Sequence, residues 1–164
     1  MRQIFWTASD SRVENRELRK DKMQATIPVF LALMHADPAK KFHMHFGQVE
    51  FAYKDQERPQ FKEAEDALTQ AIQIRGSWQK HNFVLYELNR AICRIQLENE
   101  KVEQGIPPTA ASKAAILEDL RVLSANEEMA KRVLEGTDRE NTAIREWMKR
   151  NNIDPKKEFG LASS

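Results

Sequence analysis

The chain has 164 residues, 41% hydrophobic and 31% charged, and its 26 basic and 25 acidic residues leave a formal net charge of +1. This length fits one domain, and the balanced charge excludes a global field that would attract nucleic acid or an anionic membrane. The single cysteine, Cys93, excludes an internal disulfide framework. The longest apolar run, Ile27–Met34, is too short to span a bilayer, and the N-terminus shows no signal-peptide pattern. We therefore expect a cytoplasmic protein.

Apolar residues recur with a period close to 3.6 along most of the chain, which predicts an all-α fold. Ser11 or Asp10 is expected to cap a first helix that runs to about Ala36 and kinks or breaks at Pro28. The further helices are predicted over 38–53, 60–75, 78–99, 110–124, 126–135 and 138–150. The pattern thus predicts about seven helices.

Cap and breaker residues set the predicted helix ends. Asp37 with Pro38 opens the second helix, and Gly76 ends the third. Further along, Ser77 and Thr109 are predicted as caps, a short helix is predicted from Asn126 to Gly136, and Thr137 or Asp138 is expected to open the last helix. The predicted organisation is an N-terminal extension over 1–10, one α-helical domain over 11–150 and a flexible C-terminal tail over 151–164.

The stretch from Phe42 to Gly76 carries the clearest pattern, in which large and small apolar residues alternate along two helices. Its members are Phe46, Val49, Tyr53, Phe61, Ala64, Leu68 and Ala71. In length and pattern this stretch resembles a tetratricopeptide repeat, whose period is about 34 residues. It departs from the family at Glu50, where a small residue is usual, at Gly76, where a proline is usual, and in a longer turn.

The resemblance covers roughly residues 26–124, because 85–124 resembles a degraded second unit and the segment before Asp37 resembles the second helix of a preceding one. It implies antiparallel helical hairpins stacked as a short right-handed array. The alternative is a generic antiparallel helical bundle, in which the same alanines serve only close packing.

In tetratricopeptide proteins the first helices of successive units line a concave groove, so the resemblance implies a peptide-binding site there. Its candidate residues are Phe51, Lys54, Phe83, Tyr86, Asn89, Arg90 and Arg94. Aromatic rings beside three cations suit an acidic or aromatic peptide, or a C-terminal carboxylate. Two alternatives remain open: Asn89 holds a neighbouring backbone, and terminal helices fill the groove.

The function expected from these features is a non-catalytic interaction module that binds a protein or peptide partner, possibly an acidic one, with no cofactor, nucleic acid or membrane. One alternative is a metal-dependent enzyme that uses His43 or His45, although residues two apart on a helix point about 200° apart. Another is a self-associating structural protein with Trp6, Trp78 or Trp147 at its interface. A basic run is interpreted as solvated surface: Arg145, Lys149, Arg150, Lys156 and Lys157.

Overall fold

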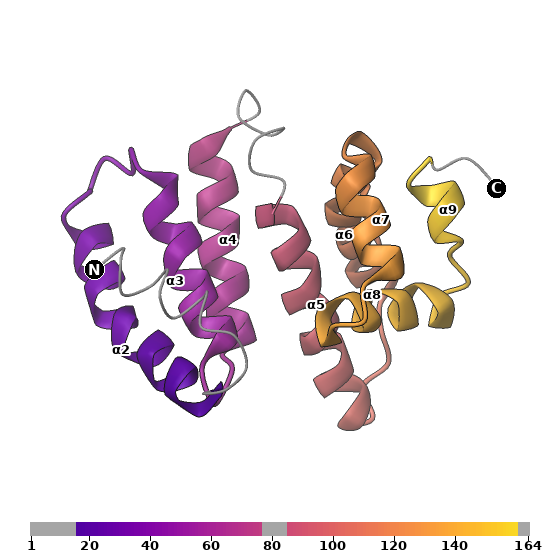
Figure 1. Cartoon of the computed structure of the whole chain (residues 1–164), viewed down its shortest axis with the longest axis horizontal. Coiled ribbons are helices and arrows are strands. Elements are labelled where there is room, and N and C mark those ends of the chain that lie inside the picture. Colours follow the sequence, from indigo (N-terminus) through magenta and orange to yellow (C-terminus); the bar gives the residue numbers. More distant parts are fainter. Residues whose placement is uncertain (1–15, 77–84, 161–164) are drawn as a thin grey trace. The chain divides into compact units, whose positions relative to one another are not determined.

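The computed structural model describes residues 16–76 and 85–160, and all regular structure in these ranges is helical. The helices are α2 (Arg16–His35), α3 (His43–Asp55), α4 (Phe61–Arg75), α5 (Leu85–Glu103), α6 (Ala110–Leu120), the 3-10 helix η2 (Arg121–Ala125), α7 (Glu127–Glu135), α8 (Arg139–Arg150) and α9 (Pro155–Glu158) (Figure 1). The all-α prediction is therefore confirmed for the described residues. The predicted caps at Asp10, Ser11 and Ser77, and the extension over 1–10, lie outside those residues.

The chain divides into two compact units, residues 1–80 and 81–164, which we call unit 1 and unit 2. The sequence predicted a single domain over 11–150, whereas the contacts divide that range after Lys80. Each unit contains buried apolar residues of its own. The two units are therefore described separately.

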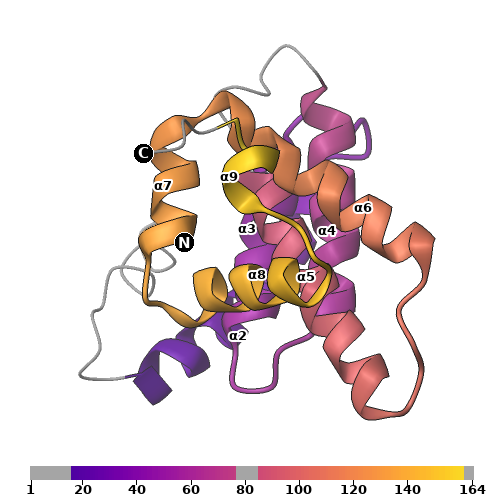
Figure 2. The same ribbon diagram turned by 90° about the vertical axis from the view of Figure 1, so that its right-hand side faces the viewer.

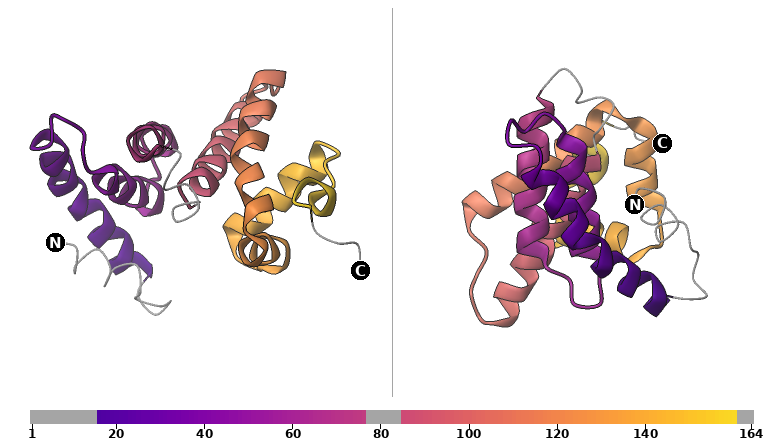
Figure 3. Two further views of the ribbon diagram at one scale, coloured as in Figure 1. Left: turned by 90° about the horizontal axis from the view of Figure 1, so that it is seen from above. Right: turned by 90° about the vertical axis from the view of Figure 1, so that its left-hand side faces the viewer.

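Unit 1 is a stack of three helices in which α3 packs against both α2 and α4 (Figure 1). Its core joins all three helices through Met23 and Phe30 of α2, Val49 of α3 and Ala67 of α4. Viewed from the side of α2, this helix lies in front of α3 and α4 (Figure 3). One side of α2 is thus packed, and the other side is outermost in the unit.

Helix α2 continues through Pro28, where the sequence predicted a kink or a break. A proline inside a helix removes the hydrogen bond to the carbonyl four residues earlier, here that of Gln24. Gln24 and Pro28 both lie on the exposed part of the helix, so water can solvate that carbonyl. Thr26 does not begin a new segment, because its hydroxyl donates to the carbonyl of Met23 at 2.7 Å within the same helix.

Helix α3 begins at His43, five residues later than the predicted start at Pro38. The intervening turn includes Lys40 in the left-handed region, with φ of 49°. Asp37 still acts on the start of the helix, because its Oδ2 accepts a hydrogen bond from the backbone N–H of Phe42 at 2.9 Å. The N-cap of α3 is Phe42, which makes no side-chain cap hydrogen bond, so the predicted cap at Asp37 is wrong. Asp37 instead orders the turn that precedes the helix.

The turn between α3 and α4 is closed by its own polar groups. The N–H of Gln60 donates to the carbonyl of Tyr53 at 2.9 Å, and Gln56 Nε2 donates to Gln60 Oε1 at 2.8 Å. At the other end of α4, Gly76 adopts φ of 68° and its N–H donates to the carbonyl of Ile72. The predicted helix end at Gly76 is confirmed.

Unit 2 packs α6 and α8 against the long helix α5, and α7 against α8. Its core includes Ile92 and Ile95 of α5, Leu120 of α6, and Trp147 of α8. Figure 2 shows α8 crossing the end of α7 steeply after the short turn that contains Gly136. The cap predicted at Thr109 and the start predicted at Thr137 or Asp138 are confirmed, and the structure adds a cap at Asn126. The side chains of Thr109, Asn126 and Asp138 each accept a hydrogen bond from the backbone N–H three residues later.

One buried carboxylate ties three helices of unit 2 together. Glu98 of α5 accepts hydrogen bonds from Trp147 Nε1 of α8 at 2.7 Å and from the Ser112 hydroxyl of α6 at 2.8 Å. Arg150 approaches the same carboxylate at 3.5 Å and donates to Asn99 Oδ1 at 2.9 Å. A buried charge is tolerated only when it is hydrogen-bonded, so this network specifies how α5, α6 and α8 pack.

The predicted tail over 151–164 is partly folded. Asp154 caps the short helix α9 by accepting hydrogen bonds from the N–H groups of Lys156 and Lys157. Phe159 follows the helix and is 2% exposed within the core of unit 2. Ile153 also packs against this core, and Glu158 pairs with Arg121 at 3.0 Å, so the polar composition that predicts a flexible tail is offset by these contacts.

We predict that Phe159→Ala lowers the free energy of unfolding by about 3–5 kcal/mol, the usual effect of removing a buried aromatic side chain. Urea denaturation followed by far-UV circular dichroism measures the change. The neighbouring exposed Lys157→Ala should change stability by less than about 0.5 kcal/mol. Equal effects of the two variants would mean that the tail does not dock.

Candidate functional site

Two of the predicted ligand-binding cations bind a carboxylate of their own unit. Arg90 Nη2 lies 2.6 Å from Asp119 Oδ1, and Arg90 Nε lies 3.0 Å from Asp119 Oδ2. Arg94 Nη1 donates to Asp119 Oδ2 at 2.8 Å and to the carbonyl of Ala115 at 3.1 Å. The two arginines of α5 therefore join this helix to α6.

Asp119 is nearly fully buried, and burial raises its pKa above the ordinary value although Arg90 and Arg94 act in the opposite direction. Ionisation of this carboxyl at neutral pH therefore costs folding free energy that the arginines only partly offset. Replacing both arginines by glutamate would place new negative charge beside a buried carboxylate. Such a variant would test the stability of unit 2 and not the binding of an acidic peptide.

The other predicted residues of unit 2 are less informative. Tyr86 and Asn89 are buried residues of α5, and Asn89 lies one position before the arginine that binds Asp119. Phe83 lies outside the described residues. The hypothesis that Asn89 holds a ligand or a neighbouring backbone stays a prediction.

In unit 1, Phe51 and Lys54 interact with each other and with their surroundings. Phe51 is half-buried and packs against the core formed by α2, α3 and α4. Lys54 is buried, its Nζ lies 5.9 Å from the centre of the Phe51 ring, and it pairs with Asp55 Oδ1 at 2.9 Å. These contacts give both residues a role in packing. The predicted groove draws on both units, so it also stays a prediction.

A different surface of unit 1 is both apolar and exposed. It is the side of α2 that faces away from α3, and we call it the α2 outer face. Its residues are Ala25, Pro28, Val29, Ala32, Leu33 and Ala36. Leu33 is 38% exposed, the four small or cyclic residues are exposed, and Val29 is half-buried. No Asp, Glu, Lys or Arg occurs anywhere between Met23 and Ala36.

The helical period explains why these residues share a side. At about 100° per residue, the residues of the α2 outer face lie within one sector of the helix, and Met23 and Phe30 lie nearly opposite. Met23 and Phe30 are buried in the core, whereas the outer sector meets solvent. Two polar residues, Gln24 and His35, are exposed beside this sector, next to Pro28. In the described residues α2 is covered on one side only.

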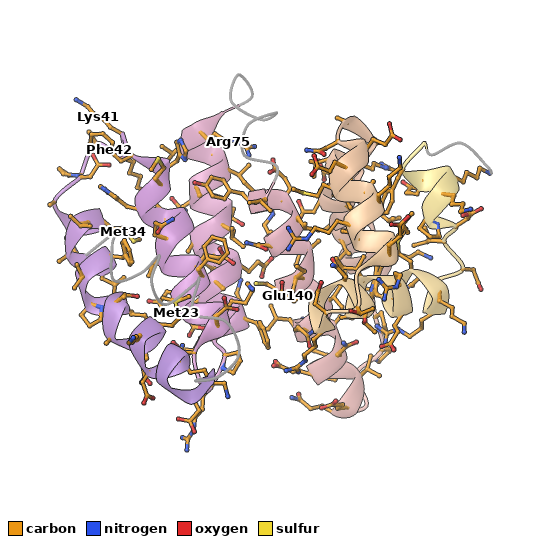
Figure 4. All side chains as sticks on the ribbon, viewed as in Figure 1. Met23, Met34, Lys41, Phe42, Arg75 and Glu140 are labelled. Carbon is orange, nitrogen blue, oxygen red and sulfur yellow. The ribbon has the colours of Figure 1, made fainter. Side chains whose placement is uncertain are left out.

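Phe42 adds a second exposed apolar residue to unit 1, in the turn that follows α2. Its side chain is 57% exposed, and its ring lies 5.4 Å from that of His45. Figure 4 shows Lys41 and Phe42 side by side at the connection between α2 and α3. The hydrogen bond from the Phe42 N–H to Asp37 holds the backbone of this residue in place.

The histidines of the metal hypothesis lie near the start of α3. His45 contacts the Phe42 ring, and its Nδ1 is buried without a hydrogen-bond partner. Among the residues that the structure describes, no group of three or more His, Cys, Asp or Glu side chains could hold a metal ion. Of the tryptophans expected at a subunit interface, Trp147 is instead buried inside unit 2, and Trp6 and Trp78 are not described.

The α2 outer face was not among the sequence predictions, although a signal for it exists. The run Ile27–Met34 is too short to span a membrane, which by itself predicts no surface. Its informative property is the absence of charge around the whole circumference of a helix, which predicts burial on more than one side. In the structure no helix of the described ranges is long and apolar enough to cross a bilayer.

Comparison with known proteins adds no family to this description. No protein-family model, curated protein or solved structure matches the chain.

We predict that Asp119→Ala destabilises the protein by about 3 kcal/mol, because Arg90 and Arg94 then lose their shared partner. Chemical denaturation measures this change. Glu118→Ala is the matched control, because it removes a carboxylate from the adjacent, exposed position. Equal stability of the two variants would contradict the assigned role of Asp119.

A pH dependence follows from Asp37. Burial raises the pKa of this carboxyl, but hydrogen bonds from the N–H groups of Lys41 and Phe42 and the nearby charges of His45 and Lys41 outweigh burial and hold the pKa below 3.8. The ionised carboxylate therefore stabilises the fold above that value, and the stabilisation is lost as the pH falls through the lowered pKa. The difference in melting temperature between wild type and Asp37→Asn should shrink between about pH 6 and about pH 2.5. A constant difference would contradict this account.

Proposed function

We propose that this chain is a non-catalytic interaction module, and that a protein partner binds the α2 outer face of unit 1. The observation that carries the proposal is a helix without charge from Met23 to Ala36, packed on one side and exposed on the other. Exposed apolar residues that gather on one face mark interaction sites more often than scattered ones do. Leu33 lies on this face, and Phe42 follows it in the next turn.

We also propose that unit 1 is built as tetratricopeptide-like hairpins. Its arrangement supports this, because α3 packs between α2 and α4 as the first helix of a unit does in a stack. Ala64, Ala67 and Ala71 of α4 are buried, as expected where helices approach closely. In such stacks the terminal helix needs a polar outer face to remain soluble. The solvent side of α2 carries the polar residues Gln24 and His35 but no Asp, Glu, Lys or Arg between Met23 and Ala36, which supports the view that another chain covers the apolar part of this side.

The chemistry of this face indicates the kind of partner. It offers no ion pair to a ligand, so affinity must come from burial of apolar surface and close packing. An apolar helix face of another protein meets these requirements, whereas an acidic peptide does not. The acidic partner suggested by Arg90 and Arg94 is therefore not retained, because both arginines bind Asp119.

We predict that a photo-reactive residue at position 33 cross-links the partner in the native host, whereas one at position 106 does not. Leu33 and Ile106 are both exposed apolar residues, one in unit 1 and one in unit 2. The cross-linked protein is identified by mass spectrometry, purified and titrated by calorimetry.

The double variant Leu33→Ser/Phe42→Ser should then raise the dissociation constant of that purified partner at least about tenfold, because it removes two exposed apolar anchors. Val102→Ser/Ile106→Ser is the matched control, since both residues are exposed and lie in unit 2. Equal cross-linking from both positions, or equal binding by both variants, would contradict the proposed surface.

A further inference from the structure

The C-terminal end of unit 2 is attached by few buried contacts. Within residues 151–160, which we call the C-terminal strap, Phe159 is buried and Ile153 packs beside the same core. None of the residues of helix α9 is buried, and this helix lies at the edge of unit 2 (Figure 1). By contrast, several residues of the preceding helix α8 are buried: Asn141, Ile144, Trp147 and Met148. Phe159 is thus the main apolar anchor of the strap.

We propose that the C-terminal strap opens while the rest of unit 2 stays folded, and that the site vacated by Phe159 binds a peptide in which an acidic residue directly precedes an aromatic one. The partner is a segment of another polypeptide, and it makes the contacts that Glu158 and Phe159 make in the closed state. Both steps take place in unit 2 and do not involve the α2 outer face.

The backbone hydrogen bonds of α9 do not fasten it to the rest of the unit. The N–H of Glu158 donates to the carbonyl of Asp154 at 2.9 Å, within the strap. The N–H of Phe159 donates to the carbonyl of Pro155 at 2.9 Å, also within the strap. A helix this short is not stable in isolation, and ordering its residues costs conformational entropy. Segments with few buried apolar contacts open at a lower free energy than the whole fold, so we expect the strap to open first.

Two cations outside the strap contact its two ends. Lys113 Nζ of α6 donates to the carbonyl of Asn151 at 3.1 Å. Arg121 Nε of η2 pairs with Glu158 Oε1 at 3.0 Å, and the Arg121 side chain is 63% exposed, so this pair adds little stability. Lys113 binds a backbone carbonyl, which any peptide can supply, whereas Arg121 selects an acidic side chain. The two contacts therefore position the strap along α6 and η2 without preventing its opening.

Opening leaves an apolar site with a positive charge beside it. Phe159 belongs to the core cluster that includes Leu120 and Leu123, which lie on either side of Arg121 in the sequence. When Phe159 leaves, the apolar surface that it covered is stabilised by burial of another apolar side chain. Arg121 has then also lost its acidic partner. Because Glu158 and Phe159 are consecutive, a peptide with the order acidic then aromatic satisfies both requirements.

The strap itself competes with any such peptide for the site. Because it belongs to the same chain, its effective concentration is on the order of millimolar, and an added peptide should bind the wild type weakly. Phe159→Ala removes the competing side chain. The full-length Phe159→Ala chain is therefore titrated by calorimetry with a synthetic peptide of residues 151–160. The variant should bind this peptide at least about tenfold more tightly than the wild type does.

Two controls test the aromatic and the acidic residue of the peptide. The same peptide with Phe159→Ala should not bind. Arg121→Glu, added to the Phe159→Ala chain, should raise the dissociation constant of the unchanged peptide at least about threefold, because an attraction becomes a repulsion. Arg132→Glu, at an exposed position of α7, should not. The proposal is overturned if the unchanged peptide does not bind, if both peptides bind alike, or if both arginine variants have the same effect.

Amide hydrogen exchange of the wild-type chain measures the opening without any substitution. The N–H groups of Glu158 and Phe159 should exchange at least about 100-fold faster than the slowest N–H groups of α5 and α8. Equally slow exchange would mean that the strap opens only when unit 2 unfolds. Loss of the folded state in Phe159→Ala, followed by circular dichroism, would mean the same. Either result overturns the proposal, whereas cross-linking from position 33 tests the α2 outer face separately.

Discussion

A helix can bury its apolar surface only against another element, and this constraint explains the features of unit 1. Helix α3 has neighbours on two sides, so its apolar residues are covered by α2 and α4. Helix α2 ends the described stack and has α3 on one side only, yet it is uncharged on all sides from Met23 to Ala36. Its outer face thus has the composition of a buried surface and the position of an exposed one. That mismatch is the reason for proposing α2 as the interaction surface.

In unit 2, charged residues of the kinds that often bind ligands instead join neighbouring helices. Glu98 and Asp119 are buried carboxylates there, and both accept hydrogen bonds from donors on neighbouring helices. Glu98 joins α5 to α6 and α8 through Ser112 and Trp147, and Asp119 joins α6 to α5 through two arginines. Breaking a buried charged pair costs more than the pair contributes over an apolar alternative. Glu98 and Asp119 therefore mainly specify how the helices pack. Arg90 and Arg94 of α5 stabilise this packing through Asp119.

Local signals predicted most helices and many of their ends. Thr109, Asn126, Asp138 and Gly76 each set a helix end through hydrogen bonds within a few residues, which are encoded in the adjacent sequence. Predictions from the sequence were wrong where contacts between different helices determine the local structure. A proline inside a helix predicts a kink or a break, and the break does not occur, because α2 is one helix through Pro28 and packs along α3. A polar tail argues for mobility, but Phe159 finds a place in the core of unit 2.

The residues of the candidate site also separate into features that the local sequence predicts and features that packing between helices determines. The amino-acid sequence alone was enough to predict the all-α class and the hairpin of α3 and α4, because helical periodicity is a local property. It also contains the charge-free stretch between Met23 and Ala36, from which no interaction surface was predicted. Packing between helices determined that Arg90 and Arg94 share Asp119, that Phe51 packs into the core, and that Leu33 is exposed. These outcomes depend on which side of a helix meets a neighbour, and residues distant in the chain supply that neighbour. Sequence periodicity shows that a helix has an apolar side, but it does not show which apolar side remains uncovered.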